Sequence, residues 1–194
     1  MTRRPRVVLA SGSPQRRAIL ELLGVDFVVS VSDVAELGVG DPETVARENA
    51  VRKARTVAGR LAGGPDASVR VLGVDTLVAL GPTIYGKPAD EAAARATLEA
   101  LSGRTHVVVS GLALIGAGRP ESTATVVTTV RIRRLDRALI DWYVAAGEWR
   151  GRAGGYAIQG RGIALVEGID GDYSNVVGLP VGGLLELWPE LLAS

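Results

Sequence analysis

A short segment near the N-terminus, "LASGSPQRR" at residues 9–17, gathers residue types that can bind an anion. Ser13 is a favourable N-cap and Pro14 suits a first helical turn, so a helix is expected to begin here. The free N–H groups and the dipole of a helix N-terminus attract anions, and Ser11, Ser13 and Arg16 add further donors. The segment favours a phosphate site, although a capped helix with surface arginines explains the same residues. It is not a Walker A loop, because the Gly-Lys-Ser/Thr ending is missing.

Acidic residues at two places could provide general-base or metal chemistry. Asp75, followed by Thr76, interrupts the apolar run "GVDTLV", where a carboxylate is unfavourable unless it has partners or a function. Asp33 and Glu36 follow an expected strand in "SDVAE", and with Asp75 they could form an oxygen-only site that suits Mg²⁺ or Mn²⁺. The alternatives are an Asp that caps a turn and loop carboxylates that are simply solvated.

Lysine is rare in this chain, because only Lys53 and Lys87 among the 22 basic residues are lysines. A compact ammonium group at either position could neutralise a polyphosphate, whereas compositional bias explains both residues equally well. Gln159, in "GGYAIQGRG", carries an amide that could recognise the edge of a base or satisfy backbone groups. His106 has no nucleophile motif beside it, and we expect it to be structural.

Composition excludes several classes of site. The 194 residues include no cysteine and one histidine, which excludes disulfides, cysteine nucleophiles, thiolate metal sites and multi-histidine metal sites. The formal net charge of +1 argues against broad nucleic-acid binding. No apolar run approaches the roughly 20 residues of a membrane span. We therefore expect a soluble cytoplasmic protein with no nucleic-acid or membrane partner.

The pattern of apolar and turn residues predicts one α/β domain over residues 1–194, with strands in mixed directions. Helices are expected at 14–23, 41–63, 90–103, 136–147 and near 182–188. Strands are expected at 6–11, 25–32, 69–80 (one bent strand or a pair), 105–116 and 122–135, with a turn at 81–88. The two long strands at 105–116 and 122–135 suit an antiparallel pair.

The order of these motifs resembles the Maf family of nucleoside triphosphate pyrophosphatases. The similarity covers nearly the whole chain, through "LASGSPQRRAILELLG", "ENAVRKA", "GVDTLV", "YGKP", "SGRTHVVVSG", "GGYAIQG" and "GDYSNVVGLP". It implies a mixed, elongated α/β sheet flanked by helices, with a central substrate cleft. It also implies hydrolysis of a nucleoside triphosphate to the monophosphate and pyrophosphate with a divalent metal cation, Mg²⁺ or Mn²⁺. Members are often dimeric, so a homodimer is a further expectation.

The resemblance also assigns roles to residues. Asp-Thr at 75–76 and the glutamine at 159 resemble the branch that acts on dTTP and UTP, whereas the branch that acts on 7-methyl-GTP typically has Asp-Gln and Glu there. Asp75 falls on the catalytic base, and the positions linked to substrate choice are Gln15, Thr76 and Gln159. The other polar positions of the site are Ser11, Ser13, Arg16, Glu36, Lys53 and Lys87.

In the mechanism that we expect, water attacks the α-phosphorus, Asp75 accepts its proton, and Glu36 and Asp75 hold the metal. The serines, Arg16 and the two lysines bind the phosphates. Gln15 stands where the family usually has Arg, so the preferred nucleotide stays open. A pyrophosphatase of another Maf branch and a non-catalytic nucleotide-binding regulator of cell division are the alternatives.

Overall fold

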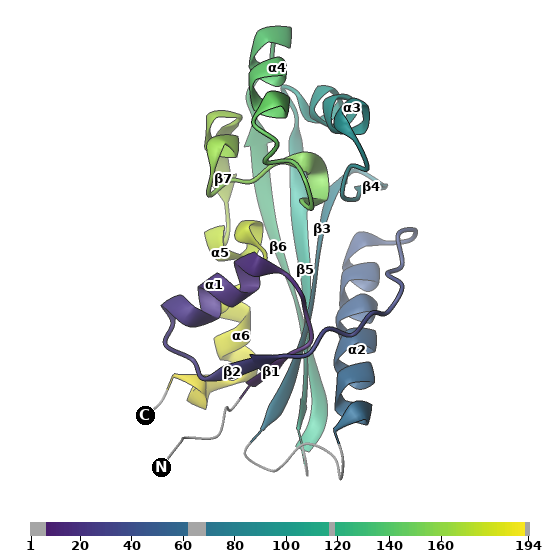
Figure 1. The fold of residues 1–194 in the computed structure, drawn as a ribbon, viewed down its shortest axis with the longest axis vertical. Coiled ribbons are helices and arrows are strands. Elements are labelled where there is room, and N and C mark those ends of the chain that lie inside the picture. Colours follow the sequence, from purple (N-terminus) through teal and green to yellow (C-terminus); the bar gives the residue numbers. More distant parts are fainter. Residues whose placement is uncertain (1–6, 62–68, 117–118, 193–194) are drawn as a thin grey trace.

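The computed structural model describes residues 7–61, 69–116 and 119–192 of this chain. Within these residues, seven strands form one elongated mixed sheet in the order β2-β1-β3-β5-β6-β7, and β4 pairs with β3 off this path (Figure 1). β1 is parallel to β2 and β3, and the other pairs are antiparallel. The strands are β1 (Val7–Leu9), β2 (Phe27–Val29), β3 (Arg70–Leu80), β4 (Thr83–Tyr85), β5 (Thr105–Gly116), β6 (Arg119–Ile132) and β7 (Val166–Asp170).

Helices cover both faces of the long strands. Figure 1 shows α2 on one side of β3 and β5 and α1, α5 and α6 on the other, while α3 and α4 lie at one end. The helices are α1 (Pro14–Leu22), α2 (Pro42–Arg60), α3 (Glu91–Leu101), α4 (Arg137–Ala145), α5 (Tyr173–Val177) and α6 (Val181–Leu187), with 3₁₀ turns η1 (Ala153–Gly155), η2 (Arg161–Ala164) and η3 (Pro189–Leu191). None of the helices in these ranges combines the length and the apolar composition needed to cross a membrane.

Two glycines allow α2 to lie unusually close to the sheet. A Cβ atom on Gly73 would lie 2.1 Å from the carbonyl oxygen of Ala50, and one on Gly111 would lie 2.3 Å from that of Ala46. Both distances are far below van der Waals contact, so any side chain there would push the helix outward. Because Asp75 is directly opposite Gly111 in the ladder, this close approach brings α2 side chains to Asp75.

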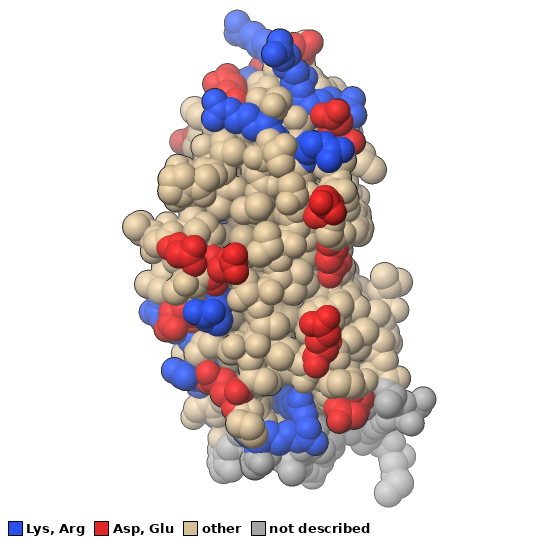
Figure 2. Space-filling view, turned by 180° about the vertical axis from the view of Figure 1, so that it is seen from behind, with Lys and Arg blue, Asp and Glu red and all other residues tan. Residues whose placement is uncertain are grey.

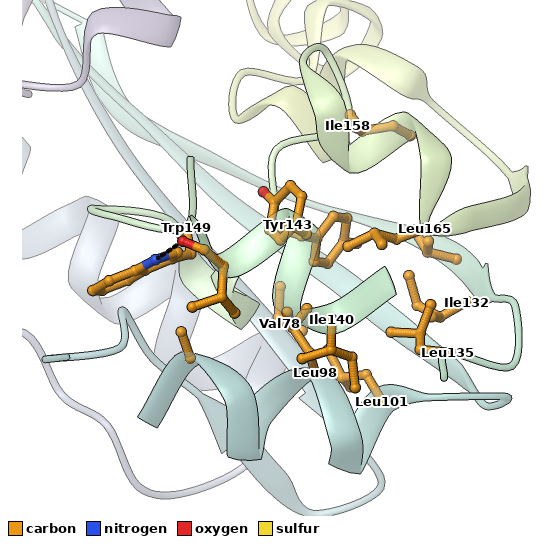
Figure 3. Packing of buried hydrophobic residues seen from close by; sticks show 14 of the residues in the cluster. Val78, Leu98, Leu101, Ile132, Leu135, Ile140, Tyr143, Trp149, Ile158 and Leu165 are labelled. Atoms are coloured by element: carbon orange, nitrogen blue, oxygen red, sulfur yellow. Dashed lines mark hydrogen bonds between the residues drawn. The ribbon is translucent and has the colours of Figure 1, made fainter. Parts of the chain in front are cut away.

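Two apolar clusters stabilise the opposite ends of the sheet. One packs α3 and α4 against the ends of β5 and β6 and contains Leu98, Tyr143 and Trp149 (Figure 3). The other joins β1, α1 and α6 and contains Leu20 and Leu184. The middle of β3 lies between these clusters.

Most of the elements expected from the sequence are present. β5 and β6 form the predicted antiparallel pair, and the predicted helices correspond to α1–α4 and α6. Residues 62–63 of the predicted second helix, and residue 6 of the first strand, lie outside the described residues.

The segment 69–80 contains one strand, so the alternative of a single strand is confirmed and that of a pair is wrong. Two other expectations about strands need correction. The predicted turn at 81–88 contains β4, because Gly81 adopts a φ of +57° and reverses the chain so that β4 pairs with β3. The predicted strand at 25–32 is only three residues long, since β2 is an edge strand whose partner β1 is equally short.

Candidate active site

A cavity of about 400 Å³ lies beside the middle of β3. Its volume is in the range of small-molecule binding sites. Its walls come from the β1–α1 turn, the loop before α2, the segment after β4 and the region around η1. All ten residues predicted to form the site line this cavity: Ser11, Ser13, Gln15, Arg16, Glu36, Lys53, Asp75, Thr76, Lys87 and Gln159. The fold therefore brings the candidate residues to one place, and their roles stay predictions.

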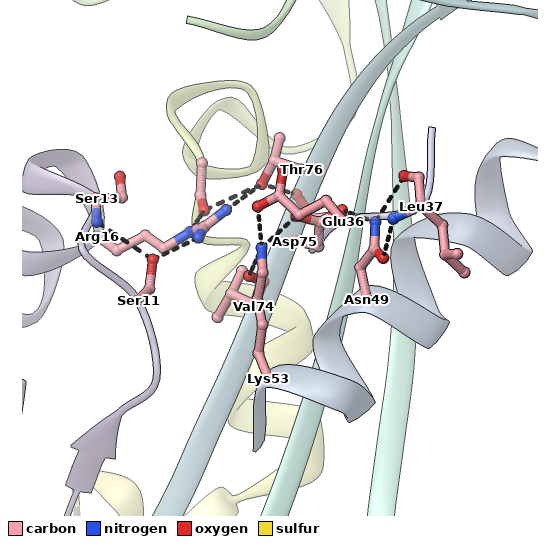
Figure 4. Close-up of polar contacts among 12 residues, drawn as sticks. Ser11, Ser13, Arg16, Glu36, Leu37, Asn49, Lys53, Val74, Asp75 and Thr76 are labelled. Atoms are coloured by element: carbon pink, nitrogen blue, oxygen red, sulfur yellow. Dashed lines mark hydrogen bonds and ion pairs between the residues drawn. The ribbon is translucent and has the colours of Figure 1, made fainter. Parts of the chain in front are cut away.

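Asp75 lies in the middle of β3 rather than at a turn, and it is only 3% exposed. Its Oδ1 accepts a hydrogen bond from Lys53 Nζ at 2.6 Å, and its Oδ2 accepts one from Asn49 Nδ2 at 2.9 Å (Figure 4). A buried carboxylate requires such partners. Each carboxylate oxygen retains a second lone pair, so Asp75 can also accept a hydrogen bond from a molecule in the cavity.

Lys53 joins two carboxylates. Its Nζ contacts Asp75 and also Glu36 Oε1, at 2.5 Å, although Glu36 comes from the loop before α2. Burial alone would raise the pKa of Glu36, but the hydrogen bond and charge of Lys53, with the charges of Lys87 and Arg16, hold that pKa below its ordinary value. Glu36 is therefore ionised at neutral pH.

Asn49 is a site residue that the sequence analysis missed. It is 1% exposed, and besides Asp75 its Nδ2 contacts the carbonyl oxygen of Leu37 at 3.0 Å. Its Oδ1 accepts a hydrogen bond from the Leu37 N–H at 2.8 Å. Asn49 thus fixes the Glu36 loop and Asp75 at the same time. The sequence did contain a clue to its role. Asn49 stands in "ENAVRKA", four residues before Lys53, and therefore lies on the same face of the helix.

The N-terminus of α1 keeps backbone donors free for an anion. Ser13 occupies the expected N-cap position, but its side chain makes no capping hydrogen bond and instead donates to Gln15 Oε1 at 3.1 Å. The first helical N–H groups of α1 therefore have no capping side chain. Together with Ser11 and Ser13 on the cavity wall, they retain the features of an anion site.

The sequence suggested that the Arg16 side chain is free to bind phosphate, but in the structure it is largely engaged by protein groups. Its guanidinium is buried and donates to Ser11 Oγ at 2.6 Å, Thr76 Oγ1 at 3.1 Å and the Gly178 carbonyl oxygen at 2.9 Å. Thr76 also shares a 2.8 Å hydrogen bond with Ser110. Three of the five guanidinium N–H groups are thus occupied, so Arg16 orients the serine and the threonine while two N–H groups remain.

His106 has the structural role expected from the sequence. It is 2% exposed, and its Nε2 shares a 2.8 Å hydrogen bond with the hydroxyl of Tyr156. Burial lowers the pKa of His106 to about 4, so the ring is neutral at physiological pH. His106 does not line the cavity, and its partner Tyr156 belongs to the apolar cluster of α3 and α4.

Asp75 and Glu36 are the groups best placed to hold a metal ion. Their carboxylates converge on one ammonium group, but no cluster of three or more His, Cys, Asp or Glu side chains occurs within the described ranges. Mg²⁺ is usually held by one or two protein carboxylates together with substrate phosphates and water. The donor set therefore fits a cation that substrate helps to bind.

Surface charge is distributed unevenly over the molecule. On the face shown in Figure 2, Lys and Arg lie mainly toward the two ends, where Asp and Glu also occur, and the middle carries mostly uncharged residues with some Asp and Glu. A phosphate backbone would require a continuous basic surface. The part of this face that belongs to described residues does not provide one.

Comparisons with known proteins identify relatives of this chain. A curated protein named dTTP/UTP pyrophosphatase from Symbiobacterium thermophilum is 45% identical over 91% of this chain and 89% of its own length. One of the same name from Deinococcus radiodurans is 47% identical over 94% of this chain and 91% of its own length. A solved nucleoside-triphosphatase / dITP/XTP pyrophosphatase from Mycobacterium abscessus is 21% identical, with a TM-score of 0.46 over 66% of this chain and 74% of that chain.

The model of one protein family, described as Maf-like protein, matches residues 6–191. This match spans the β1–α1 turn, Lys53 on α2, Asp75 on β3 and the last cavity residues before α6. The chain belongs to the Maf-like protein family.

Proposed function

We propose that this protein hydrolyses the pyrimidine nucleoside triphosphates dTTP and UTP to the nucleoside monophosphate and pyrophosphate. The relatives at about 45% identity carry the name of this activity. The observation that carries the proposal is Asp75, a buried carboxylate in the centre of an apolar strand that faces a cavity of substrate size. A site that only bound a nucleotide would have no need of such a base.

The proposed reaction is attack of water on the α-phosphorus. Asp75 accepts one proton from the water, a bond forms between the water oxygen and the α-phosphorus, and the bond to the bridging oxygen breaks, so that pyrophosphate leaves. Lys53 and Asn49 hold the carboxylate in one orientation. Most of the rate enhancement then comes from positioning and from stabilisation of the developing charge.

Phosphate binding uses donors and cations in the cavity lining. The free N–H groups of α1, the hydroxyls of Ser11 and Ser13, and the ammonium group of Lys87 all line the cavity. Lys53 lies beside Asp75, where negative charge develops during the attack. If a divalent cation is bound, Glu36 and Asp75 would hold it, and it would neutralise phosphate charge and polarise the scissile bond.

Selection of a pyrimidine uses polar groups at the edge of the same cavity. Thr76 is fixed by Arg16 and Ser110, Gln15 is half-buried, and Gln159 is exposed at the rim. Amide and hydroxyl groups can pair with the carbonyl and N–H groups of uracil or thymine. A base with a different arrangement of hydrogen-bond donors and acceptors leaves these protein groups without partners, and its binding is therefore weaker. Because the segments that line the cavity connect elements packed on one sheet, we propose that the chain works as one catalytic domain.

The first test is a panel of dTTP, UTP, CTP, 7-methyl-GTP and purine triphosphates with Mg²⁺ or Mn²⁺, in which pyrophosphate and phosphate are measured separately. We expect pyrophosphate release led by dTTP and UTP. Release led by another nucleotide would contradict the roles of Gln15, Thr76 and Gln159. Nucleotide binding without release of pyrophosphate or phosphate would favour the alternative of a non-catalytic nucleotide-binding protein.

The second test is Asp75→Asn, which removes the base but keeps the size of the side chain. We expect a loss of kcat of at least about a hundredfold, with nucleotide still bound. Asp136→Asn is the matched control, because Asp136 caps α4 outside the cavity and Asn is an equally good cap. Ordinary turnover by Asp75→Asn would remove Asp75 from the role of base.

A further inference from the structure

Arg152 lines the cavity, and no described residue forms an ion pair with its guanidinium. Its Nε is buried and makes no hydrogen bond, and no described residue accepts a hydrogen bond from the rest of its guanidinium. Burying an N–H group without a hydrogen-bond partner costs the free energy of removing it from water, because nothing replaces its hydrogen bonds to water. The guanidinium, which lines the cavity and has no described acceptor, therefore suits a ligand that accepts hydrogen bonds.

The backbone fastens Arg152 to the segment that carries Lys87. The N–H of Gly154 donates to the carbonyl oxygen of Gly86 at 3.1 Å, and a Cβ on Gly155 would lie 3.1 Å from Pro88 Cγ. Gly154 has a φ of +67°, and a Cβ there would lie 2.8 Å from Val78 on β3, so a larger residue would displace this segment. Arg152 and Lys87 therefore stand on two adjoining segments of one cavity wall.

The cations of the cavity divide into two kinds. Lys53 is neutralised by Asp75 and Glu36, and Arg16 is engaged by Ser11, Thr76 and Gly178. In contrast, the side chains of Lys87 and Arg152 form no ion pair and no hydrogen bond with any described residue. Lys87 and Arg152 are thus the cavity cations whose side-chain donors remain free of any described partner.

We infer that Arg152, together with Lys87, binds the two terminal phosphates of the substrate and stabilises the pyrophosphate as it leaves. This assignment rests on the proposed function. The α-phosphate must lie at Asp75 and Lys53, where the water attacks, so the unpaired cations Lys87 and Arg152 elsewhere in the cavity lining are available for the leaving group. The planar fork of Arg152 matches two phosphate oxygens, whereas Lys87 provides a point charge.

The experiment measures product inhibition of the full-length enzyme by pyrophosphate and by UMP, each separately. Arg152→Met removes the charge and keeps the aliphatic stem, and Arg152→Lys keeps the charge without the fork. Arg150→Met is the matched control, because Arg150 lies outside the cavity with its guanidinium 4.5 Å from the ring centroid of Trp149.

For Arg152→Met, we expect the inhibition constant of pyrophosphate to rise about tenfold or more, and that of UMP to stay within about twofold of the wild-type value. Arg152→Lys should lie between wild type and Arg152→Met, and Arg150→Met should match wild type. An unchanged pyrophosphate constant in Arg152→Met, or an equal rise for UMP, would overturn the assignment.

Failure of the proposed function is distinguishable from failure of this inference. If the wild-type protein releases no pyrophosphate from any nucleotide, the proposed function fails at that step. Calorimetric titration of wild type, Arg152→Met and Arg152→Lys with pyrophosphate in the same buffer then decides the inference alone. Binding that weakens in Arg152→Met and partly returns in Arg152→Lys supports the subsite, and equal binding by all three proteins refutes it.

Discussion

Lys53→Met tests whether the buried ion pair at the centre of the site is a source of stability. The side chain of Lys53 is 8% exposed, and its Nζ contacts Asp75, which is 4% exposed in its side chain, and Glu36, which is 44% exposed. Methionine keeps a long unbranched apolar chain, so the substitution removes mainly the ammonium group. Asp75 is then a buried carboxylate whose only described hydrogen-bond donor is Asn49.

The expected magnitude follows from the burial of each partner. Removing one member of a buried ion pair destabilises a protein by about 3–5 kcal/mol, because the other charge stays buried without compensation. Loss of the contact with the half-exposed Glu36 adds at most about 1 kcal/mol, since solvent screens such pairs. In the double variant Lys53→Met/Asp75→Asn no buried charge remains, so at least about 2 kcal/mol of the loss should return.

The assay is urea unfolding at pH 7, followed through the fluorescence of the three tryptophans and extrapolated to water. Lys53→Met/Glu36→Gln is the matched control, because it removes the charge of the exposed partner instead, and it should be about as unstable as Lys53→Met. Equal stability of Lys53→Met/Asp75→Asn and Lys53→Met would refute the argument, since it would mean that the isolated Asp75 charge is not the source of the loss.

Two further variants test the surroundings of the site. Asn49→Asp keeps the acceptor for the Leu37 N–H, but it loses both donated hydrogen bonds and places a carboxylate beside Asp75. We therefore expect the free energy of unfolding, measured in urea, to fall by about 2 kcal/mol or more. The initial rate of hydrolysis should also fall. A wild-type-like kcat in Asn49→Asp would contradict its positioning role. Folding lowers the pKa of His106 from 6.5 to about 4. Between these values the unfolded chain binds the proton and the folded protein does not, so about 3 kcal/mol of stability is lost as pH falls from 6.5 to 4. The stability gap between wild type and His106→Gln, measured by urea unfolding from pH 7 to 4, should shift by this amount, and a constant gap would exclude the effect.

Local signals in the sequence predicted much of the fold. The helices and the long antiparallel pair depend on periodicity and on caps within a few residues, which the sequence displays directly. β4 escaped prediction because a three-residue strand has too little periodicity, and its pairing depends on the chain reversal at Gly81. The shortness of β2 depends on the length of its partner β1, which is not a local property.

The sequence by itself determined which residues could do chemistry. An apolar strand interrupted by Asp75, a helix start rich in hydroxyls and only two lysines are visible without any structure, because each depends on near neighbours along the chain. Only the tertiary structure decided what these residues contact. Gly73 and Gly111 allow α2 to pack closely against the sheet. Because of this close packing, Asn49 and Lys53 are within hydrogen-bond distance of Asp75.

The same distinction separates the two arginines of the cavity. Arg16 donates to Gly178, 162 residues further along the chain, and so it became a group that orients the site rather than a free ligand. Arg152, which no motif singled out, has a guanidinium without a described partner, on a segment that glycine contacts join to the segment of Lys87. Charge compensation depends on distances in space between residues far apart in the chain, and for that reason only the folded structure shows which charges remain available to a substrate.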